Sequence, residues 1–425
     1  MAIGDKIHLI NKEEVQGAIG NISNPLLDLP LNNSLAMKQG VGSVEFTRST
    51  TATYIDRYGV LKTADIDEPR FEKDGLLIEG SSTNVSIHSQ TFTDSSYAIA
   101  NNGTFTQDVD NIDGSTDAVK FTTSTEEETQ QFNKTNFPAT DNATFTTSAT
   151  VEQSGDYVYF QMTSGNFSAY ETRGTVVFNL QDGLVVSENT DDGEGNITGA
   201  ITDLGNGRYR CELRGQVWND SGNNSHCYMS VRKVANIGVF EGDGTSGVIL
   251  HNFQVEVLPF ATSYIPTTDS AVTRGTDLCE VTAKDNIPII NEGFTFLMTY
   301  TSNSFVASRH LIDFGDSRRA GYIQQYNDAG FTYWSGSTDL SNKNSDMVLN
   351  SGLTGRTARI GMVVKNKLPY CIDDGVIIDN SLTREASISV PTTIKFGVGN
   401  HTNFGYIKNF KIWDKALTAT EVALA

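Results

Sequence analysis

The sequence predicts an all-β protein built from β-sandwiches that follow a short, partly helical N-terminal segment. Apolar residues come in runs of about four to seven between Gly, Asn and Asp turn signals, which favours strands over long helices. At 425 residues the chain is too long for one ordinary core, so two or three domains are expected. No apolar run reaches the length of about 18 residues that a membrane-spanning helix needs, and we expect no membrane insertion.

The N-terminal segment, Met1–Ser43, has too few apolar residues for a core of its own, so we expect it to dock on another protein or domain. Helical spacing of its apolar residues predicts a short helix over Lys12–Ile22, with Asn11 and Glu14 placed like a capping box. The first residues mix both charges and lack the apolar stretch of a signal peptide. We therefore expect synthesis in a cytoplasm without secretion.

The formal net charge of −20 is concentrated in the middle of the chain. Ser86–Asp277 holds 25 acidic and 9 basic residues, a net charge of −16. Nucleic acid is not expected as a partner, because phosphate binding needs clustered Lys and Arg. We interpret the acidic excess as a surface that keeps the protein soluble, with an acidic binding face as the alternative.

The cysteines show neither a CxxC pair nor metal-type spacing. We predict free buried thiols. Cys211 and Cys227 lie in strand-like runs and could be neighbours, so a bond between these two stays open.

The segment 44–277 has the layout of one sandwich with its lead-in strands. Period-2 alternation, bounded by turn residues, predicts a series of strands. These are Leu76–Glu79, Val119–Thr122, Thr144–Glu152, Tyr157–Thr163, Thr175–Leu180, Tyr209–Leu213 and Phe253–Val257. Pro259 ends the last of them because proline cannot donate to the ladder. We expect Phe260–Ile265 to cover an edge of the sandwich and Pro266–Asp277 to be a short connector.

Several motifs in this segment occur in a fixed order. Phe46, Arg48, Ala52–Tyr54, Asp56, Gly59 and Leu61 form F-x-R-x-x-x-A-T-Y-x-D-x-x-G-x-L, followed by P-R-F at Pro69–Phe71 and G-L-L-I-E-G-S-S-T-N at Gly75–Asn84. G-N-G-x-Y-R-C begins at Gly205, and F-A-T-S-Y-I-P-T-T begins at Phe260. Together they resemble the β-modules of tailed-bacteriophage virion proteins, such as tail fibres, appendages and head fibres. The resemblance implies a jelly roll of the carbohydrate-binding-module type.

The segment 278–425 predicts a second sandwich. Strand candidates include Phe294–Thr301 and Arg356–Val364, and the turn Asp373–Gly375 joins two more. The closing stretch from Gly405 is an alternating strand, and we expect its Trp413 to point into the core. Thr418 and Glu421 then form a capping box that should open a short terminal helix. This ending resembles that of concanavalin-like, laminin-G-type domains, although no sugar- or calcium-ligand set of that family is visible.

No constellation of residues indicates chemistry. The acidic clusters lie in turn-rich sequence, the histidines never pair at i,i+2 or i,i+4, and no nucleotide-binding glycine pattern stands in context. Asp108, Asp110 and Asp113 resemble the start of a calcium loop, but no Glu closes it. We therefore predict no catalytic residue, no metal and no cofactor, and we predict that the chain is not an enzyme.

Aromatic side chains that could stack on sugar rings are the candidate binding residues. Tyr333 and Trp334 lie between glycines near a strand end, and Trp218 lies in a turn. Packing in a core or a subunit interface is the alternative for all three.

The resemblance implies a bacteriophage virion structural protein, a tail fibre or appendage that contacts host-surface polysaccharide or another receptor. It also implies a homotrimer, joined to other virion proteins through Met1–Ser43. Two other classes stay open. One is a capsid head-fibre, decoration or tail-sheath protein without a ligand, and the other is the binding modules of a carbohydrate-active enzyme.

Overall fold

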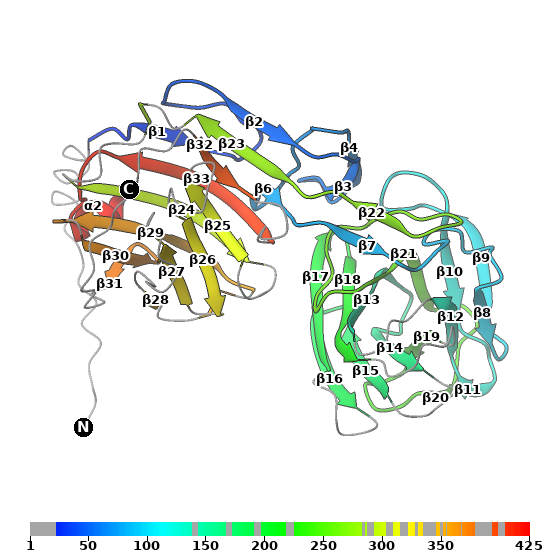
Figure 1. Cartoon of the computed structure of the whole chain (residues 1–425). Coiled ribbons are helices and arrows are strands. Elements are labelled where there is room, and N and C mark those ends of the chain that lie inside the picture. Colours follow the sequence, from blue (N-terminus) through cyan, green and yellow to red (C-terminus); the bar gives the residue numbers. More distant parts are fainter. Residues whose placement is uncertain are drawn as a thin grey trace, which may run out of the picture. The chain divides into compact units, whose positions relative to one another are not determined.

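A computed structural model gives the fold, and it confirms the all-β prediction (Figure 1). The chain divides into two compact units, which are described separately. Unit 1 contains Met1–Arg48, Glu68–Gly80 and Thr276–Ala425, and unit 2 contains Ser49–Asp67 and Ser81–Gly275. The structure describes residues 23–137, 143–166, 172–190, 197–217, 225–282, 285–286, 293–302, 309–314, 322–327, 330–334, 346–348, 352–353, 355–366, 368–378, 393–397 and 404–425. The helix expected at Lys12–Ile22 lies outside these residues.

Unit 1 contains two antiparallel sheets, each named here by one of its strands. The β24 sheet has the order β31 (Val376–Ile378), β30 (Leu368–Asp373), β29 (Thr357–Lys365), β24 (Phe294–Ser302), β33 (Gly405–Trp413), β6 (Gly75–Ile78) and β5 (Phe71–Glu72), and β1 (Leu27–Leu29) also pairs with β33. The β32 sheet has the order β2 (Val44–Thr47), β23 (Leu278–Thr282), β32 (Thr393–Phe396), β25 (Arg309–Phe314), β26 (Tyr322–Asn327), β27 (Gly330–Trp334) and β28 (Asp346–Val348).

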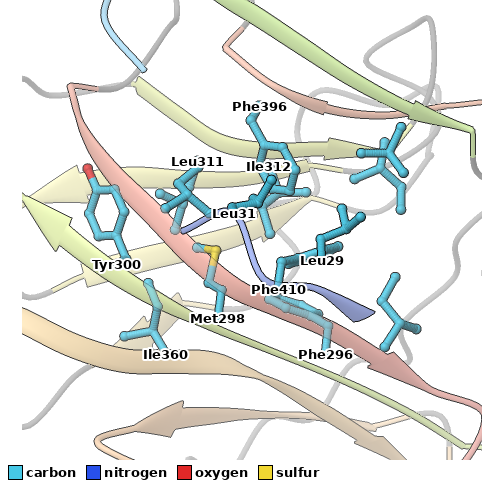
Figure 2. Close-up of a cluster of buried hydrophobic side chains, with 14 of the residues drawn as sticks. Leu29, Leu31, Phe296, Met298, Tyr300, Leu311, Ile312, Ile360, Phe396 and Phe410 are labelled. Atoms are coloured by element: carbon cyan, nitrogen blue, oxygen red, sulfur yellow. The ribbon is translucent and has the colours of Figure 1, made fainter. Parts of the chain in front are cut away.

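The core of unit 1 lies between these sheets and includes side chains from the N-terminal segment. Figure 2 shows Leu29 beside Phe410 of β33, and Leu31 beside Leu311 and Ile312 of β25. Leu29 and Leu31 are fully buried. That the chain divides into modules after Ser43 and before Leu278 stays a prediction. Within unit 1, the N-terminal strands β1, β2, β5 and β6 belong to the same sheets as strands of the C-terminal segment.

Helix α2 (Ala419–Leu424) follows β33, as the sequence predicts. The side chain of Thr418 accepts a hydrogen bond from the backbone N–H of Glu421, and the Glu421 carboxylate accepts one from the Thr418 N–H, which confirms the capping box. Val422 of the helix and Trp413 of β33 lie in one buried apolar cluster.

Unit 2 is a second sandwich. Its β21 sheet has the order β17 (Thr198–Gly205), β18 (Arg208–Val217), β13 (Thr144–Ser154), β21 (Gly247–Glu256), β10 (Ala118–Thr122) and β9 (Thr104–Val109), and β7 (Ser82–Asn84) pairs with both β21 and β22 (Val272–Arg274). Its β14 sheet has the order β16 (Leu184–Thr190), β15 (Thr172–Asn179), β14 (Tyr159–Asn166), β19 (Ser225–Arg232), β12 (Gln131–Phe137) and β8 (Tyr97–Ala100). Two ribbons complete it, β3 (Ala52–Ile55) with β4 (Leu61–Ala64) and β11 (Glu127–Thr129) with β20 (Val239–Glu241).

The core of unit 2 lies between the β21 and β14 sheets. Phe253 and Val255 come from one sheet, and Phe132, Phe160 and Met229 come from the other. Cys211 and Cys227 are buried on opposite sheets, and all four cysteines are free, which confirms the expected buried thiols and excludes a disulfide in this structure.

The stretch Phe260–Ile265 packs against the outer side of the β21 sheet rather than only at an edge. Its backbone is held by side chains that point away from the core: Gln254 accepts from the N–H of Ile265 at 2.7 Å, and Glu212 accepts from the N–H of Ala261 at 3.1 Å. The connector Pro266–Asp277 also contains a strand, β22, which the sequence did not indicate.

Candidate functional site

The structure gives no contact for any of the aromatic residues predicted to bind a ligand. Trp218 lies outside the described residues. Tyr333 and Trp334 end strand β27, and their side chains also lie outside what the structure describes. Ligand stacking by these residues stays a prediction.

The motif residues in unit 1 form a buried ionic network. Asp277 accepts from Arg48 at 3.2 Å and from Arg70 at 2.5 Å, and Arg70 also contacts Glu79 at 2.9 Å. The side chains of Arg48, Arg70 and Asp277 have no exposed surface. Burial alone would lower the pKa of Arg70, but Asp277 and Glu79 outweigh it and raise that pKa. A network without exposed surface holds the chain in place and cannot meet a ligand.

The motif residues in unit 2 are also structural. Asn84 accepts from the N–H groups of Ser86 and Val255 and donates to the carbonyl of Ile265. Glu256 is fully buried and accepts from Ser82 at 2.6 Å and from the Thr262 hydroxyl at 2.6 Å. Burial raises the pKa of Glu256. The outer side of the β21 sheet is therefore occupied by the chain itself.

The outer side of the β14 sheet is different, and we call it the open face. Phe132, Met162, Val176 and Met229 point into the core, so the alternating residues of the same strands point outward. The open face comprises Gln131, Asn133, Thr135, Tyr159, Gln161, Thr163, Thr175, Val177, His226, Tyr228, Ser230 and Arg232. Within the described part of the chain, no strand lies across it.

The register arranges these residues in rows. Gln131, Ser230, Gln161 and Val177 are successive neighbours across four strands. In the next row Asn133, Tyr228, Thr163 and Thr175 are neighbours in the same way. Ser230 and Val177 are buried, whereas the longer side chains around them are half-buried. The open face thus presents amide, hydroxyl and tyrosine groups at strand spacing.

Some polar atoms of the open face have unused hydrogen-bonding capacity. Gln161 donates through Nε2 to Thr163 at 2.8 Å, but its buried Oε1 has no partner. Arg232 donates through Nη1 to the carbonyl of Ala235 at 3.1 Å, and its Nε has no partner. Buried polar atoms normally find a partner, and an unpaired one costs about 1–3 kcal/mol, so these two atoms are a local cost of the fold.

The open face is nearly neutral. None of its residues is Asp or Glu, although Ser86–Asp277 carries a net charge of −16. Arg232 is the charged residue of the set, and burial lowers its pKa. Burial also lowers the pKa of His226, whose ring stacks on Tyr228 with centroids 6.3 Å apart. Such a surface can hydrogen-bond hydroxyl groups and pack on apolar ring faces, but it offers little to a strongly charged ligand.

The sequence contains this signal in a form that is hard to use. Tyr159-x-Gln161-x-Thr163 lies in a predicted strand, and Gln131-x-Asn133-x-Thr135 shows the same alternation although no strand was predicted there. Alternation predicts that each triplet faces outward. It does not show that β12, β19 and β14 are neighbours, or that the chain covers the outer side of the β21 sheet and not that of the β14 sheet.

The described residues contain no group of three or more His, Cys, Asp or Glu side chains arranged to hold a metal ion. They also include no helix long and apolar enough to span a membrane.

No family model matches the chain, and no curated protein matches it significantly. Among solved structures, the protein crystallised as HCR/D-Sa-GBL1/C is 14% identical with a TM-score of 0.28, and the match covers 35% of this chain and 40% of that one. A Trypanosoma rangeli sialidase is 12% identical with a TM-score of 0.26, over 63% of this chain and 50% of that one. The chain thus spans half or less of the length of these proteins, and similarity this low carries no argument about function.

One expectation is nevertheless corrected by these matches. We predicted that the chain is not an enzyme, but the matched structures include sialidases, among them a mutant that displays trans-sialidase activity at 10% identity and a TM-score of 0.26. The prediction that the chain is not an enzyme is therefore withdrawn. The matches assign no activity to this chain.

Proposed function

We propose that the chain is a structural protein of a tailed-bacteriophage virion, a tail fibre or appendage that contacts glycans of the host surface through the open face of unit 2. The open face carries the proposal, because its rows of amides, hydroxyls and tyrosines are neutral in a strongly acidic segment. The ordered motifs support the virion assignment, since they occupy the buried positions that a shared module would need to keep.

The chemistry of the open face favours a neutral polysaccharide. Sugar hydroxyls both donate and accept, so they can pair with the amide and hydroxyl groups that the half-buried side chains of the open face present. Tyr159 and Tyr228 add flat apolar surface with a polar tip. The shallow arrangement fits repeated weak contacts better than one tight site. A homotrimer, which we include in the proposal, would multiply such contacts through effective concentration.

The virion contact is proposed for the N-terminal end of the segment Met1–Ser43. Leu27, Leu29 and Leu31 belong to the buried core of unit 1 and are not available to another protein. The segment before β1 therefore takes the docking role in the proposal, and the virion is the proposed location.

The test is binding of the purified protein to host cells and to their isolated surface polysaccharide. We expect Gln161→Ala and Tyr228→Ala each to weaken binding about fivefold or more, the effect of losing roughly 1 kcal/mol or more at a contact residue. The matched controls are Gln153→Ala on the β21 sheet and Tyr58→Ala, whose side chain is 75% exposed in another part of unit 2. Both should bind like the wild type.

Other outcomes favour the other classes. If the protein binds neither cells nor polysaccharide, and electron microscopy places it on the capsid or tail tube, it is a head-fibre, decoration or sheath protein. If purified protein alone shortens the polysaccharide, the chain belongs to a carbohydrate-active enzyme, and the proposed role in binding is wrong.

A further inference from the structure

A serine and a lysine meet at the edge of the β14 sheet, where the lysine side chain points to the side opposite the open face. Ser96 directly precedes strand β8, and Lys134 lies in the neighbouring strand β12, opposite Tyr97. The Lys134 ammonium and the Ser96 hydroxyl are hydrogen-bonded. The N–H of Thr135 donates to the Ser96 carbonyl at 2.8 Å, so the backbone fixes the pair.

Lys134 is an unusual residue for the interior of a sandwich. It is 1% exposed and points to the same side of β12 as the core residue Phe132. Its Nζ lies 4.3 Å from the centroid of the Tyr97 ring, and among the described residues no carboxylate lies within ion-pair distance of it. The Tyr97 hydroxyl is also buried without a partner.

Burial changes the protonation of this amine. Removal from water lowers the pKa of Lys134 to about 8, and Asp94 opposes that shift. With such a pKa, about half of the amine is neutral near pH 8, whereas an exposed lysine with a pKa of about 10.4 stays protonated there.

Ser96 is the more accessible member of the pair. It is half-buried, in a turn held by the Asp94 carboxylate, which accepts from the N–H of Ser96 at 2.8 Å. Asp94 in turn lies 3.5 Å from His88 Nε2. A half-buried serine whose hydroxyl bonds a buried amine has the pairing of a nucleophile and its base, in which serine attacks and lysine takes the proton.

We infer that Ser96 is a nucleophile with Lys134 as its general base, and that the pair accepts an acyl group from small carboxylic esters. Ser96 Oγ forms a bond to the carbonyl carbon while its proton moves to Lys134 Nζ. The carbonyl–alkoxy bond breaks, and the leaving alcohol takes the proton from Lys134. Water then attacks the acyl-serine, with Lys134 again accepting and returning a proton, which releases the acid and frees Ser96. This activity is independent of the proposed glycan contact.

The test uses the full chain with p-nitrophenyl acetate. We expect nitrophenol release above the buffer rate, rising with pH through about 8, and an acetyl group on Ser96 in peptide mass mapping. Ser96→Ala and Lys134→Met should lower the rate about 100-fold or more, the usual contribution of a positioned base. Ser95→Ala, an exposed neighbour, is the matched control and should keep the wild-type rate.

Lys134→Arg separates the roles, because arginine keeps the positive charge but cannot act as a base at these pH values. We expect it to fold and to be inactive. If Lys134→Met fails to fold, the rate of Ser96→Ala and the pH profile of the wild type still test whether the pair is catalytic. Absence of acetyl-Ser96, or an unchanged rate in Ser96→Ala, would overturn the inference.

Discussion

Asp277 shows at the scale of a single residue why the motifs of this chain are structural. Its carboxylate contacts both Arg48 and Arg70, and none of the three side chains has exposed surface. Sequence reasoning did not place these arginines in an interior, because arginine is almost never fully buried unless it is paired. The motif positions were therefore visible in the sequence, and their burial was not.

Asp277→Asn should destabilise the protein strongly. The substitution keeps the size of the side chain and removes the negative charge that contacts two buried guanidinium groups. We expect the free energy of unfolding to fall by about 3–5 kcal/mol in urea denaturation at pH 7. The control Lys38→Ala removes an ion pair whose lysine is 75% exposed, and it should cost less than about 1 kcal/mol. A loss below 1 kcal/mol for Asp277→Asn would contradict the network's role.

Lys134→Met should stabilise the protein at pH 7. The folded-state pKa of Lys134 is about 8, whereas an unfolded lysine has a pKa of about 10.4. The unfolded state therefore binds the proton more tightly, and the stability of the wild type rises as the pH increases from about 8 to about 10.4. We expect the variant to be more stable at pH 7 by about 1–3 kcal/mol and the difference to shrink by pH 10. A difference that stays constant over this pH range would contradict burial of the charged amine.

At the scale of elements, the N-cap of the C-terminal helix α2 can be tested with two substitutions in one helix. Thr418→Ala removes the side-chain acceptor of α2, and Arg359, which donates to the carbonyl of Val422 at 2.7 Å, stays in place. We expect a loss of about 1 kcal/mol. Thr420→Ala, in the exposed interior of the same helix, should be neutral or slightly stabilising. Urea denaturation followed by far-UV circular dichroism measures both variants, and equal effects would argue against the capping box.

Single strands could be predicted from the sequence, whereas their neighbours could not. Phe294–Thr301 was expected and β24 spans Phe294–Ser302, while Thr144–Glu152 was expected and β13 spans Thr144–Ser154. Alternation reports which residues share a face of one strand. The pairing of β12 with β19 and of β19 with β14, which assembles the open face, joins residues about 100 positions apart on one side and about 70 on the other, and no local pattern records that. The binding residues chosen from the sequence were therefore isolated aromatic residues rather than a surface.

At the scale of the whole molecule, the sequence read in order suggests modules that follow one another. The structure instead builds unit 1 from three separate parts of the chain. Strand β33 pairs with β1 and β6, and β23 pairs with β2, so the C-terminal segment depends on strands from the N-terminal part of the chain. Hydrophobic alternation marks β2 and β6 as strands, but their partners lie more than 200 residues later.

Fragments of the chain test this dependence. The fragment 278–425 keeps β24 and β32 but lacks β1 and β6, which pair with β33, and β2, which pairs with β23. It also exposes the core residues that Leu29, Phe46 and Leu76 cover, so we expect it to aggregate or to remain without fixed tertiary structure. The fragment 49–275 contains the whole of unit 2, and we expect a cooperative thermal transition and a dispersed amide spectrum. Co-expression of 1–85 with 276–425, which retains Asp277, supplies β1, β2 and β6 again and should recover soluble protein. A well-folded, monomeric 278–425 fragment would show that the C-terminal sandwich is complete without the N-terminal strands, as the linear division predicts.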